Sequence, residues 1–202
     1  MLKKCNANDL PQILELWNTV FGEDENFTKW YFDNIFKPEY TIAVFEDSKL
    51  ISMLQMLPYE IKNYGKVSYI FGACTYPDHR GKGLMAKLIA FSEKLDRESC
   101  VTASILIPQE KSLFDFYKRF GYEPYFKINY KEYFKQNKKD HSYTFSEIDS
   151  NDIPLLNQVY ENSLSGTYFV IRDENCWTKQ IDMFRSLGGN AFCLKDNEKL
   201  IS

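Results

Sequence analysis

The chain has 202 residues, of which 44% are hydrophobic and 26% charged, and its formal net charge is −3. This composition suits a globular protein with one large domain or two small ones. The negative balance argues against a nucleic-acid partner, because such binders present a basic face. No stretch approaches the ~20 apolar residues of a membrane span. Five scattered cysteines and a polar N-terminus predict a reduced, cytoplasmic protein without a metal site.

Helices and strands are predicted in mixed order over the first 135 residues. The expected elements are a strand at 2–6, helices at 8–21 and 26–36, a hairpin at 40–58, a strand at 66–75, a helix ending near 96, a buried strand at 100–107, a helix at 110–120 and a closing strand from 122 to about 133. Because strands and helices do not alternate strictly, the sheet should be mixed. Gly121 is expected as a left-handed helix cap.

A glycine-containing run joins the strand at 66–75 to the helix that follows it. It contains Arg80-Gly-Lys-Gly83. The first N–H groups of a helix have no internal partner, and the helix macrodipole adds positive charge there. Glycine lets the backbone approach a bulky anion, and Arg80 and Lys82 supply cations. The run therefore predicts a phosphate cradle. The alternative is an ordinary glycine turn that enters a surface helix.

The beginning of the chain recurs later in the sequence. Asn8-Asp-Leu-Pro11 returns as Asn151-Asp-Ile-Pro154, and the stretch 41–52 is answered by 190–202. We interpret this pattern as two tandem copies of one fold. The second copy stops within its first hairpin, so we expect either truncation or pairing of the half-copy with another element. An open strand edge there would favour association into a homo-oligomer.

Two motifs resemble those of the GNAT acetyltransferase superfamily. Arg80-Gly-Lys-Gly-Leu-Met85 resembles the signature Arg/Gln-x-x-Gly-x-Gly/Ala, with Met85 as a departure. Phe116-Tyr-Lys-Arg-Phe-Gly-Tyr122 resembles the later Tyr-x-x-x-Gly-Phe/Tyr motif. Together with the repeat, the run Thr75-Tyr-Pro-Asp-His-Arg80 looks most like the Eis-like branch, in which two GNAT lobes precede a sterol-carrier-like domain.

The resemblance implies an α/β (α+β) architecture and a domain division. Residues 1–138 would form a GNAT domain with a mixed, partly splayed sheet flanked by helices. Residues 139–142 would be a linker, and residues 143–202 the N-terminal part of a second GNAT-like lobe.

The resemblance also implies a reaction. Acetyl-CoA would give its acetyl group to a primary amine of a small molecule by direct attack, with Tyr117 as the general acid. A phenol with a pKa near 10 is suited to protonate a departing thiolate. The alternative for Tyr117 is an apolar helix face shared with Phe116 and Phe120. The alternative for the protein is a non-catalytic acyl-CoA-binding or assembly module.

The implied cofactor residues fall into three groups. They are the strand end Ala73, Cys74 and Thr75; the cradle Arg80, Gly81, Lys82, Gly83, Leu84, Met85 and Ala86; and the helix start Ser112 and Leu113. Cys74 is expected to be a core residue and not a nucleophile, since direct transfer needs none.

Acidic and aromatic residues between the first two helices are the candidates for the amine site. Glu23, Asp24 and Trp30 could hold an ammonium group by charge and cation–π contact. The alternative is a solvated acidic loop above a core tryptophan. Trp177 answers Trp30 in the repeat, which favours a structural role for the tryptophan.

Overall fold

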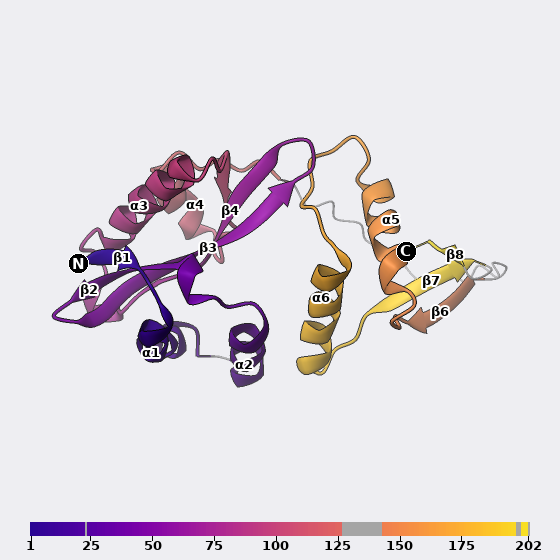
Figure 1. Cartoon of the computed structure of the whole chain (residues 1–202), viewed down its shortest axis with the longest axis horizontal. Helices are drawn as coiled ribbons and strands as arrows, with labels where there is room; N and C mark the ends of the chain where they lie inside the picture. The colour runs from indigo at the N-terminus through magenta and orange to yellow at the C-terminus, as the bar shows by residue number, and fades with distance from the viewer. Residues whose placement is uncertain (23, 127–142, 197–198, 202) are drawn as a thin grey trace. The chain divides into compact units, whose positions relative to one another are not determined.

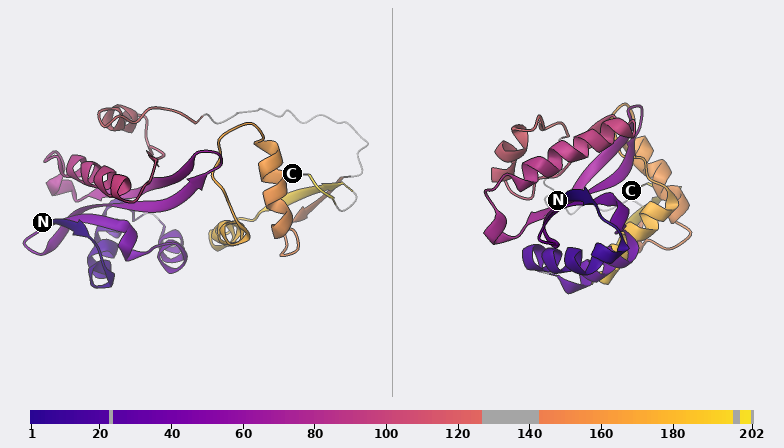
Figure 2. Two further views of the ribbon diagram at one scale, coloured as in Figure 1. Left: turned by 45° about the horizontal axis from the view of Figure 1, so that its top comes forward. Right: turned by 60° about the vertical axis from the view of Figure 1, so that its left-hand side comes forward.

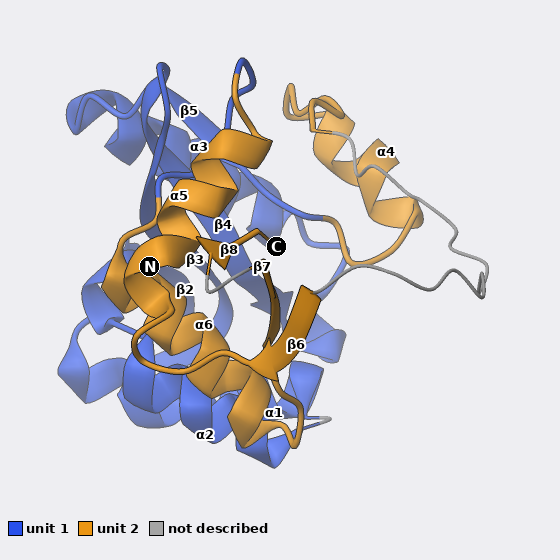
Figure 3. Ribbon diagram, turned by 90° about the vertical axis from the view of Figure 1, so that its right-hand side faces the viewer, with its two compact units in different colours: residues 1–107, 166–171 blue, residues 108–165, 172–202 orange. Residues whose placement is uncertain are grey.

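The computed structural model describes residues 1–22, 24–126, 143–196 and 199–201. The chain forms two compact units, one of residues 1–107 with 166–171 and the other of residues 108–165 with 172–202 (Figure 3). The sheet of the first unit has five strands and that of the second has three. The predicted linker at 139–142 lies outside the described residues.

The first unit is built on a mixed sheet in the order β1-β2-β3-β4-β5. Its strands are β1 (Leu2–Lys4), β2 (Thr41–Glu46), β3 (Lys49–Ile61), β4 (Gly65–Thr75) and β5 (Ala103–Ile105). The first four pair antiparallel in sequence, and β5 pairs parallel with β4. This arrangement confirms the predicted mixed sheet.

Helices cover both faces of this sheet (Figures 1 and 2). The helices α1 (Leu10–Phe21) and α2 (Glu25–Asn34) lie on one face, and α3 (Leu84–Glu98) lies on the other. In α1 the buried side chains Ile13, Leu16 and Trp17 are spaced as one helical face. They pack against β2, β3 and β4 in a core that also takes Tyr31 from α2.

Tight turns set the register of the two hairpins. Asp47 and Ser48, between β2 and β3, both have positive φ, as a two-residue hairpin turn requires. The β3–β4 hairpin turns at Asn63, again with positive φ. A later segment, Gly166–Ile171, belongs to the same unit and lies beside this turn: Lys62 N–H donates to Phe169 O, and Ile171 N–H to Glu60 O.

Part of the second unit repeats the order of elements at the start of the first. Its elements are α4 (Ser112–Lys118), β6 (Tyr143–Glu147), α5 (Ile153–Ser163), α6 (Glu174–Ser186), β7 (Phe192–Asp196) and β8 (Lys199–Leu200). From β6 onward the order of strand, two helices and hairpin matches β1 to β3. A small core joins Ile148, Ile181, Cys193 and Leu200.

Two predicted strands differ from the structure. The strand predicted as buried at 100–107 covers only Ala103–Ile105 and is half-exposed, and Cys100 is exposed with a left-handed φ of 55°. Among the described residues β5 pairs only with β4, which leaves it less covered than a strand paired on both edges. Of the predicted closing strand, residues 122–126 form no strand, and the rest lies outside the described residues. No helix in the described parts of the chain is long and apolar enough to cross a membrane.

Candidate functional site

β4 extends beyond the end of its parallel partner. Its ladder with β5 covers only Val67–Tyr69 against Ala103–Ile105, whereas β4 continues to Thr75. On its other edge, β4 stays paired with β3 as far as Thr75. From Ile70 onward, one edge of β4 is therefore outside any ladder that the described residues form. This opening confirms the partly splayed sheet expected from the sequence.

A β-bulge interrupts β4 in this open region. Gln55 of β3 is opposite Phe71, but the next paired position joins Met53 to Cys74, so that Leu54 faces both Gly72 and Ala73. Gly72 has a φ of +57°. A bulge bends its strand and redirects the backbone groups beside it. The three predicted strand residues, Ala73, Cys74 and Thr75, follow directly after this bend.

The Cys74 side chain points into the core. It is 4% exposed and packs in the cluster that contains Trp17 and Tyr31. Burial raises the pKa of its thiol, an effect that the charge of Arg80 opposes only in part. A thiol that resists ionisation is a poor nucleophile. The expectation that Cys74 is a core residue is confirmed.

The predicted cradle has the backbone geometry of an anion site. Gly81 and Gly83 both adopt left-handed φ, at 75° and 72°. Gly83 is the N-cap of α3 and has no side chain that could cap the helix. The first intrahelical hydrogen bond is the one that the N–H of Lys87 donates to Gly83 O, at 3.2 Å. The amides of Leu84, Met85 and Ala86 thus have no partner within the helix. They are aligned at the positive end of the dipole.

Basic side chains lie beside these amides. Arg80 Nε donates to Thr75 O at 3.2 Å, which ties the cradle to the end of β4. Lys82 Nζ lies 3.5 Å from His79 Nδ1, and that nitrogen lies 3.5 Å from a carboxylate oxygen of Glu46. Arg80 and Lys82 are both exposed and add positive potential to the helix start.

Tyr117 and the helix α4 belong to the second unit. The Tyr117 ring is half-buried against Phe116, at 5.1 Å between centroids, and Tyr122, at 5.8 Å. Burial raises the pKa of its phenol, which keeps the proton in place at neutral pH. Gly121 has a φ of 83°, the left-handed cap expected from the sequence.

The two other predicted residues of α4 lie in its first turn. Leu113 N–H donates to Glu110 O, and Ser112 Oγ donates to the Glu110 carboxylate at 3.4 Å. Both contacts join the first turn of α4 to Glu110, which lies just before the helix.

Two of the predicted amine-site residues, Asp24 and Trp30, have structural partners. One Asp24 carboxylate oxygen accepts the N–H groups of Asn26 and Phe27, so Asp24 is the N-cap of α2. Trp30 is half-buried and packs near Phe27, with centroids 6.5 Å apart. Glu23 lies outside the described residues.

A row of aromatic rings on β3 and β4 was not predicted from the sequence. Tyr59, Tyr69 and Phe71 lie on the sheet face that α1 and α2 cover: centroids are 5.9 Å apart for both Tyr59–Tyr69 and Tyr69–Phe71. The signal was present, because Tyr69 and Phe71 alternate along a strand and point to one face. A glycine within the strand, Gly72, also indicates a bulge.

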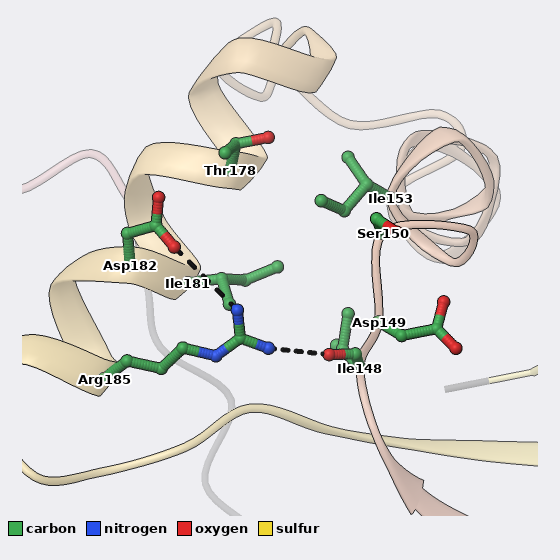
Figure 4. Close-up of a pocket in the computed structure, with 8 residues that line it drawn as sticks. All are labelled: Ile148, Asp149, Ser150, Ile153, Thr178, Ile181, Asp182 and Arg185. Carbon is green, nitrogen blue, oxygen red and sulfur yellow. Dashed lines mark hydrogen bonds and ion pairs between the residues drawn. The ribbon is translucent and has the colours of Figure 1, made fainter.

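A hollow in the second unit is lined by three isoleucines and five polar or charged residues (Figure 4). The Arg185 guanidinium donates to Ile148 O at 2.8 Å and lies 3.8 Å from the Asp182 carboxylate. The hollow contains none of the residues singled out from the sequence.

The comparisons with known proteins agree with this geometry. Residues 1–125 match the family model of the acetyltransferase (GNAT) domain, which is more than half of the chain. The fold is the GNAT fold, and the chain belongs to the GNAT acetyltransferase family. No curated protein matches the sequence.

Several solved structures share the fold. A probable N-acyltransferase from Enterococcus faecalis V583 has a TM-score of 0.76 at 16% identity, covering 99% of this chain and 53% of that one. A predicted acetyltransferase with acetyl-CoA from Clostridium acetobutylicum scores 0.54 at 16% identity, covering 64% and 95%. An aminoglycoside acetyltransferase from an uncultured soil metagenomic sample scores 0.52 at 18% identity, covering 67% and 96%. This chain thus spans about half of the Enterococcus protein.

Proposed function

We propose that this chain is an acetyl-CoA-dependent N-acetyltransferase that acts on a primary amine of a small molecule. One observation carries the proposal: the amides of Leu84, Met85 and Ala86 have no partner within helix α3, whose N-cap is Gly83. This helix start follows the open end of β4. Free amides at a helix start bind phosphate groups, and the open strand edge offers hydrogen bonds to an extended ligand.

The residues of the first unit fit the cofactor. A Cβ built on Gly81 or Gly83 would meet nothing within 4 Å, so a bulky anion can approach the backbone there. In our proposal the pyrophosphate is held by the amides from Gly81 to Ala86, with Arg80 and Lys82 adding charge. The pantetheine arm would lie along Ala73, Cys74 and Thr75. The Clostridium structure of the same fold, crystallised with acetyl-CoA, supports this assignment.

In the proposed reaction the acceptor ammonium first loses a proton to solvent. Its nitrogen then forms a bond to the thioester carbonyl carbon, the carbon–sulfur bond breaks, and the thiolate takes the proton of Tyr117. The phenol is reprotonated from the proton that the new amide gives up. Holding the reactants together supplies most of the rate. The approach of Tyr117, Ser112 and Leu113 to the cofactor is part of the proposal.

The tandem architecture supports placing the chain in the Eis-like branch. The matching element order of the two units and the coverage of about half of the Enterococcus protein are its grounds. A second candidate function is a non-catalytic acyl-CoA-binding or assembly module. It is favoured by the fact that the cradle belongs to the first unit, whereas Tyr117, the proposed general acid, belongs to the second.

A glycine pair tests the cofactor site. In Gly83→Ala the methyl group would project into the open space before the helix start, where we place the pyrophosphate. The affinity for acetyl-CoA should fall about 10-fold or more, which is a loss of roughly 1.4 kcal/mol in binding free energy. Gly188→Ala is the matched control, since Gly188 has a similar φ of 77° and equally open surroundings. Calorimetric titration of acetyl-CoA measures both. Absence of binding to the unaltered chain would contradict the proposal.

A tyrosine pair tests the chemistry. Tyr117→Phe should lower kcat about 10²-fold, as expected for a lost general acid, without weakening acetyl-CoA binding. Tyr122→Phe, in the neighbouring ring, should keep kcat. Release of the CoA thiol with a panel of amines provides the assay. Binding without turnover across the panel would favour the non-catalytic module.

A further inference from the structure

The row of rings formed by Tyr59, Tyr69 and Phe71 leads to the open end of β4. Tyr69 is the last residue of β4 that pairs with β5, and Phe71 comes directly before the bulge at Gly72. A ligand on this row would therefore reach the same stretch of strand that we assign to the pantetheine arm. Tyr59 is 37% exposed, and Tyr69 and Phe71 are half-buried, so ring surface remains at the row.

Two buried polar side chains close the end of the row at Phe71. The Tyr31 hydroxyl donates to Gln55 Oε1, and the Tyr31 ring lies 5.1 Å from that of Phe71. Gln55 is opposite Phe71 in the ladder and shares its face.

The amide nitrogen of Gln55 is an unsatisfied donor at this end. It is buried and finds no hydrogen-bond partner in the described structure. It lies 3.4 Å from the position that a Cβ of residue 72 would occupy. A buried donor left unpaired costs about 1–3 kcal/mol. Such a group beside an apolar, ring-lined surface is typical of a small-molecule site, where a few polar atoms fix the orientation of the ligand.

The charge of this surface selects among amines. The side chains that share the face on the two strands are Gln55, Leu57, Tyr59, Val67, Tyr69 and Phe71, and none of these six is charged. Ring faces attract a single ammonium group and stack on flat or apolar groups. They offer no carboxylates to the several ammonium groups of a polyamine or an aminoglycoside.

We infer that the acceptor is a monoamine on an aromatic or apolar body, an arylalkylamine in chemical class, bound on Tyr59, Tyr69 and Phe71. This inference rests on the proposed function and names the substrate class of that site. Tyr59 and Tyr69 determine specificity by contact with the aromatic or apolar body, and the Gln55 amide donates to the lone pair of the deprotonated amine before that nitrogen attacks the thioester. The bonds formed and broken are those of the proposed transfer.

The test compares tryptamine and 2-phenylethylamine with spermidine and kanamycin. The arylalkylamines should have a kcat/KM at least about 10-fold higher, which corresponds to roughly 1.4 kcal/mol. Tyr69→Leu and Tyr59→Leu should raise KM for tryptamine about 5- to 10-fold, with acetyl-CoA affinity unchanged. Tyr64→Leu is the control, because Tyr64 is an exposed ring in the β3–β4 turn, away from the bulge.

The outcomes separate this inference from the proposed function. If the unaltered chain does not bind acetyl-CoA, the proposed function is overturned. Acetyl-CoA binding together with a preference for spermidine or kanamycin, or with an unchanged KM in Tyr69→Leu, would overturn the substrate class alone. If the chain binds CoA but transfers no acetyl group, the same amines are titrated into the CoA-saturated protein by calorimetry. Tighter binding of kanamycin than of tryptamine would refute the inference, and tighter binding of tryptamine would support it.

Discussion

The ring of Trp17 occupies the space that a side chain at Gly72 would need. A Cβ built on Gly72 would lie 2.7 Å from Cζ3 of Trp17, closer than real Cβ contacts. Trp17 is 3% exposed and stacks on Tyr31 with centroids 5.2 Å apart. Helix α1 thus packs directly against the bulge of β4 through Trp17. The contact between Trp17 and Gly72 therefore links the hydrophobic core to the strand that we assign to the cofactor.

Gly72→Ala should therefore be costly. The left-handed φ and the forced shift of a packed ring together predict a loss of about 2–4 kcal/mol in the free energy of unfolding. Gly188→Ala should lose only about 1–2 kcal/mol, because it has the φ strain without the contact. Urea unfolding measures both.

The double variant Gly72→Ala with Trp17→Leu should lose less than the sum of the two single variants, since they share one steric conflict. Equal costs for Gly72→Ala and Gly188→Ala would contradict this account.

Local patterns predicted the cradle, whereas cross-strand relations escaped prediction. Gly83 followed by an amphipathic helix is visible in sequence because both features depend on neighbouring residues. The bulge opposite Leu54, and the ring row that ends beside it, depend on the register of β3 against β4. Register is set by pairing between residues far apart in sequence. The predicted burial of residues 100–107 was wrong for a related reason. Their apolar side chains suggested a buried strand, but among the described residues β5 pairs only with β4.

Asp24 shows how one residue type can carry two interpretations. An acid beside aromatic residues suggested an ammonium site, yet an Asp just before a helix is also a strong N-cap signal. The structure shows the cap, with Asn26 and Phe27 as donors. The sequence could not distinguish these roles, because both place the carboxylate at the same position in the chain.

Thiol labelling at pH 8 should separate the cysteines into two groups. Cys100 and Cys176 are exposed and should react in the native protein. Cys5, Cys74 and Cys193 are buried, and burial raises the pKa of Cys5 to about 12 and also that of Cys74. Burial keeps the labelling reagent away from all three thiols, and Cys5 and Cys74 are also poor in the reactive thiolate, so these three should react only after denaturation. Mass spectrometry counts the labels, and native modification of Cys74 would refute its assignment to the core.

The buried carboxyl of Asp96 predicts a pH effect on stability. Asp96 is 7% exposed and accepts a hydrogen bond from Ser68 Oγ at 2.5 Å. Burial raises the pKa of Asp96, the hydrogen bond from Ser68 opposes this rise, and the nearby Glu93 adds to it. The folded state then holds the proton more tightly than the unfolded state. Stability is lost as pH rises through the unfolded and then the folded pKa.

Asp96→Asn should accordingly be more stable than the unaltered protein at pH 7, and the difference should vanish at a pH below the ordinary Asp value of about 4. Urea unfolding across this range measures the change. Asp33→Asn, at an exposed carboxylate, is the control. A difference that persists at low pH would show that the effect does not come from ionisation.

The repeated Asp–Lys pair predicts unequal losses in the two units. Lys195 Nζ lies 2.6 Å from the carboxylate of Asp152, whose side chain is 5% exposed. In the first unit Lys3 Nζ lies 2.8 Å from Asp9, whose side chain is 11% exposed. Removing the lysine leaves the Asp152 carboxylate without its partner, so Lys195→Met should lower the free energy of unfolding of the second unit. Lys3→Met should cost less, because its pair is better solvated.

Acid should reduce the loss in Lys195→Met. Burial by itself would raise the pKa of Asp152, but the hydrogen bonds from Lys195 and from the Asp149 backbone outweigh it, and the folded pKa lies below its ordinary value. The stabilisation is therefore present above the unfolded pKa and disappears as pH falls through the folded one. Hydrogen exchange of the β6 and β7 amides, at neutral pH and below pH ~4, reports the local free energy. A gap between the variants that does not narrow in acid would mean that lost packing of the lysine stem, and not its charge, causes the destabilisation.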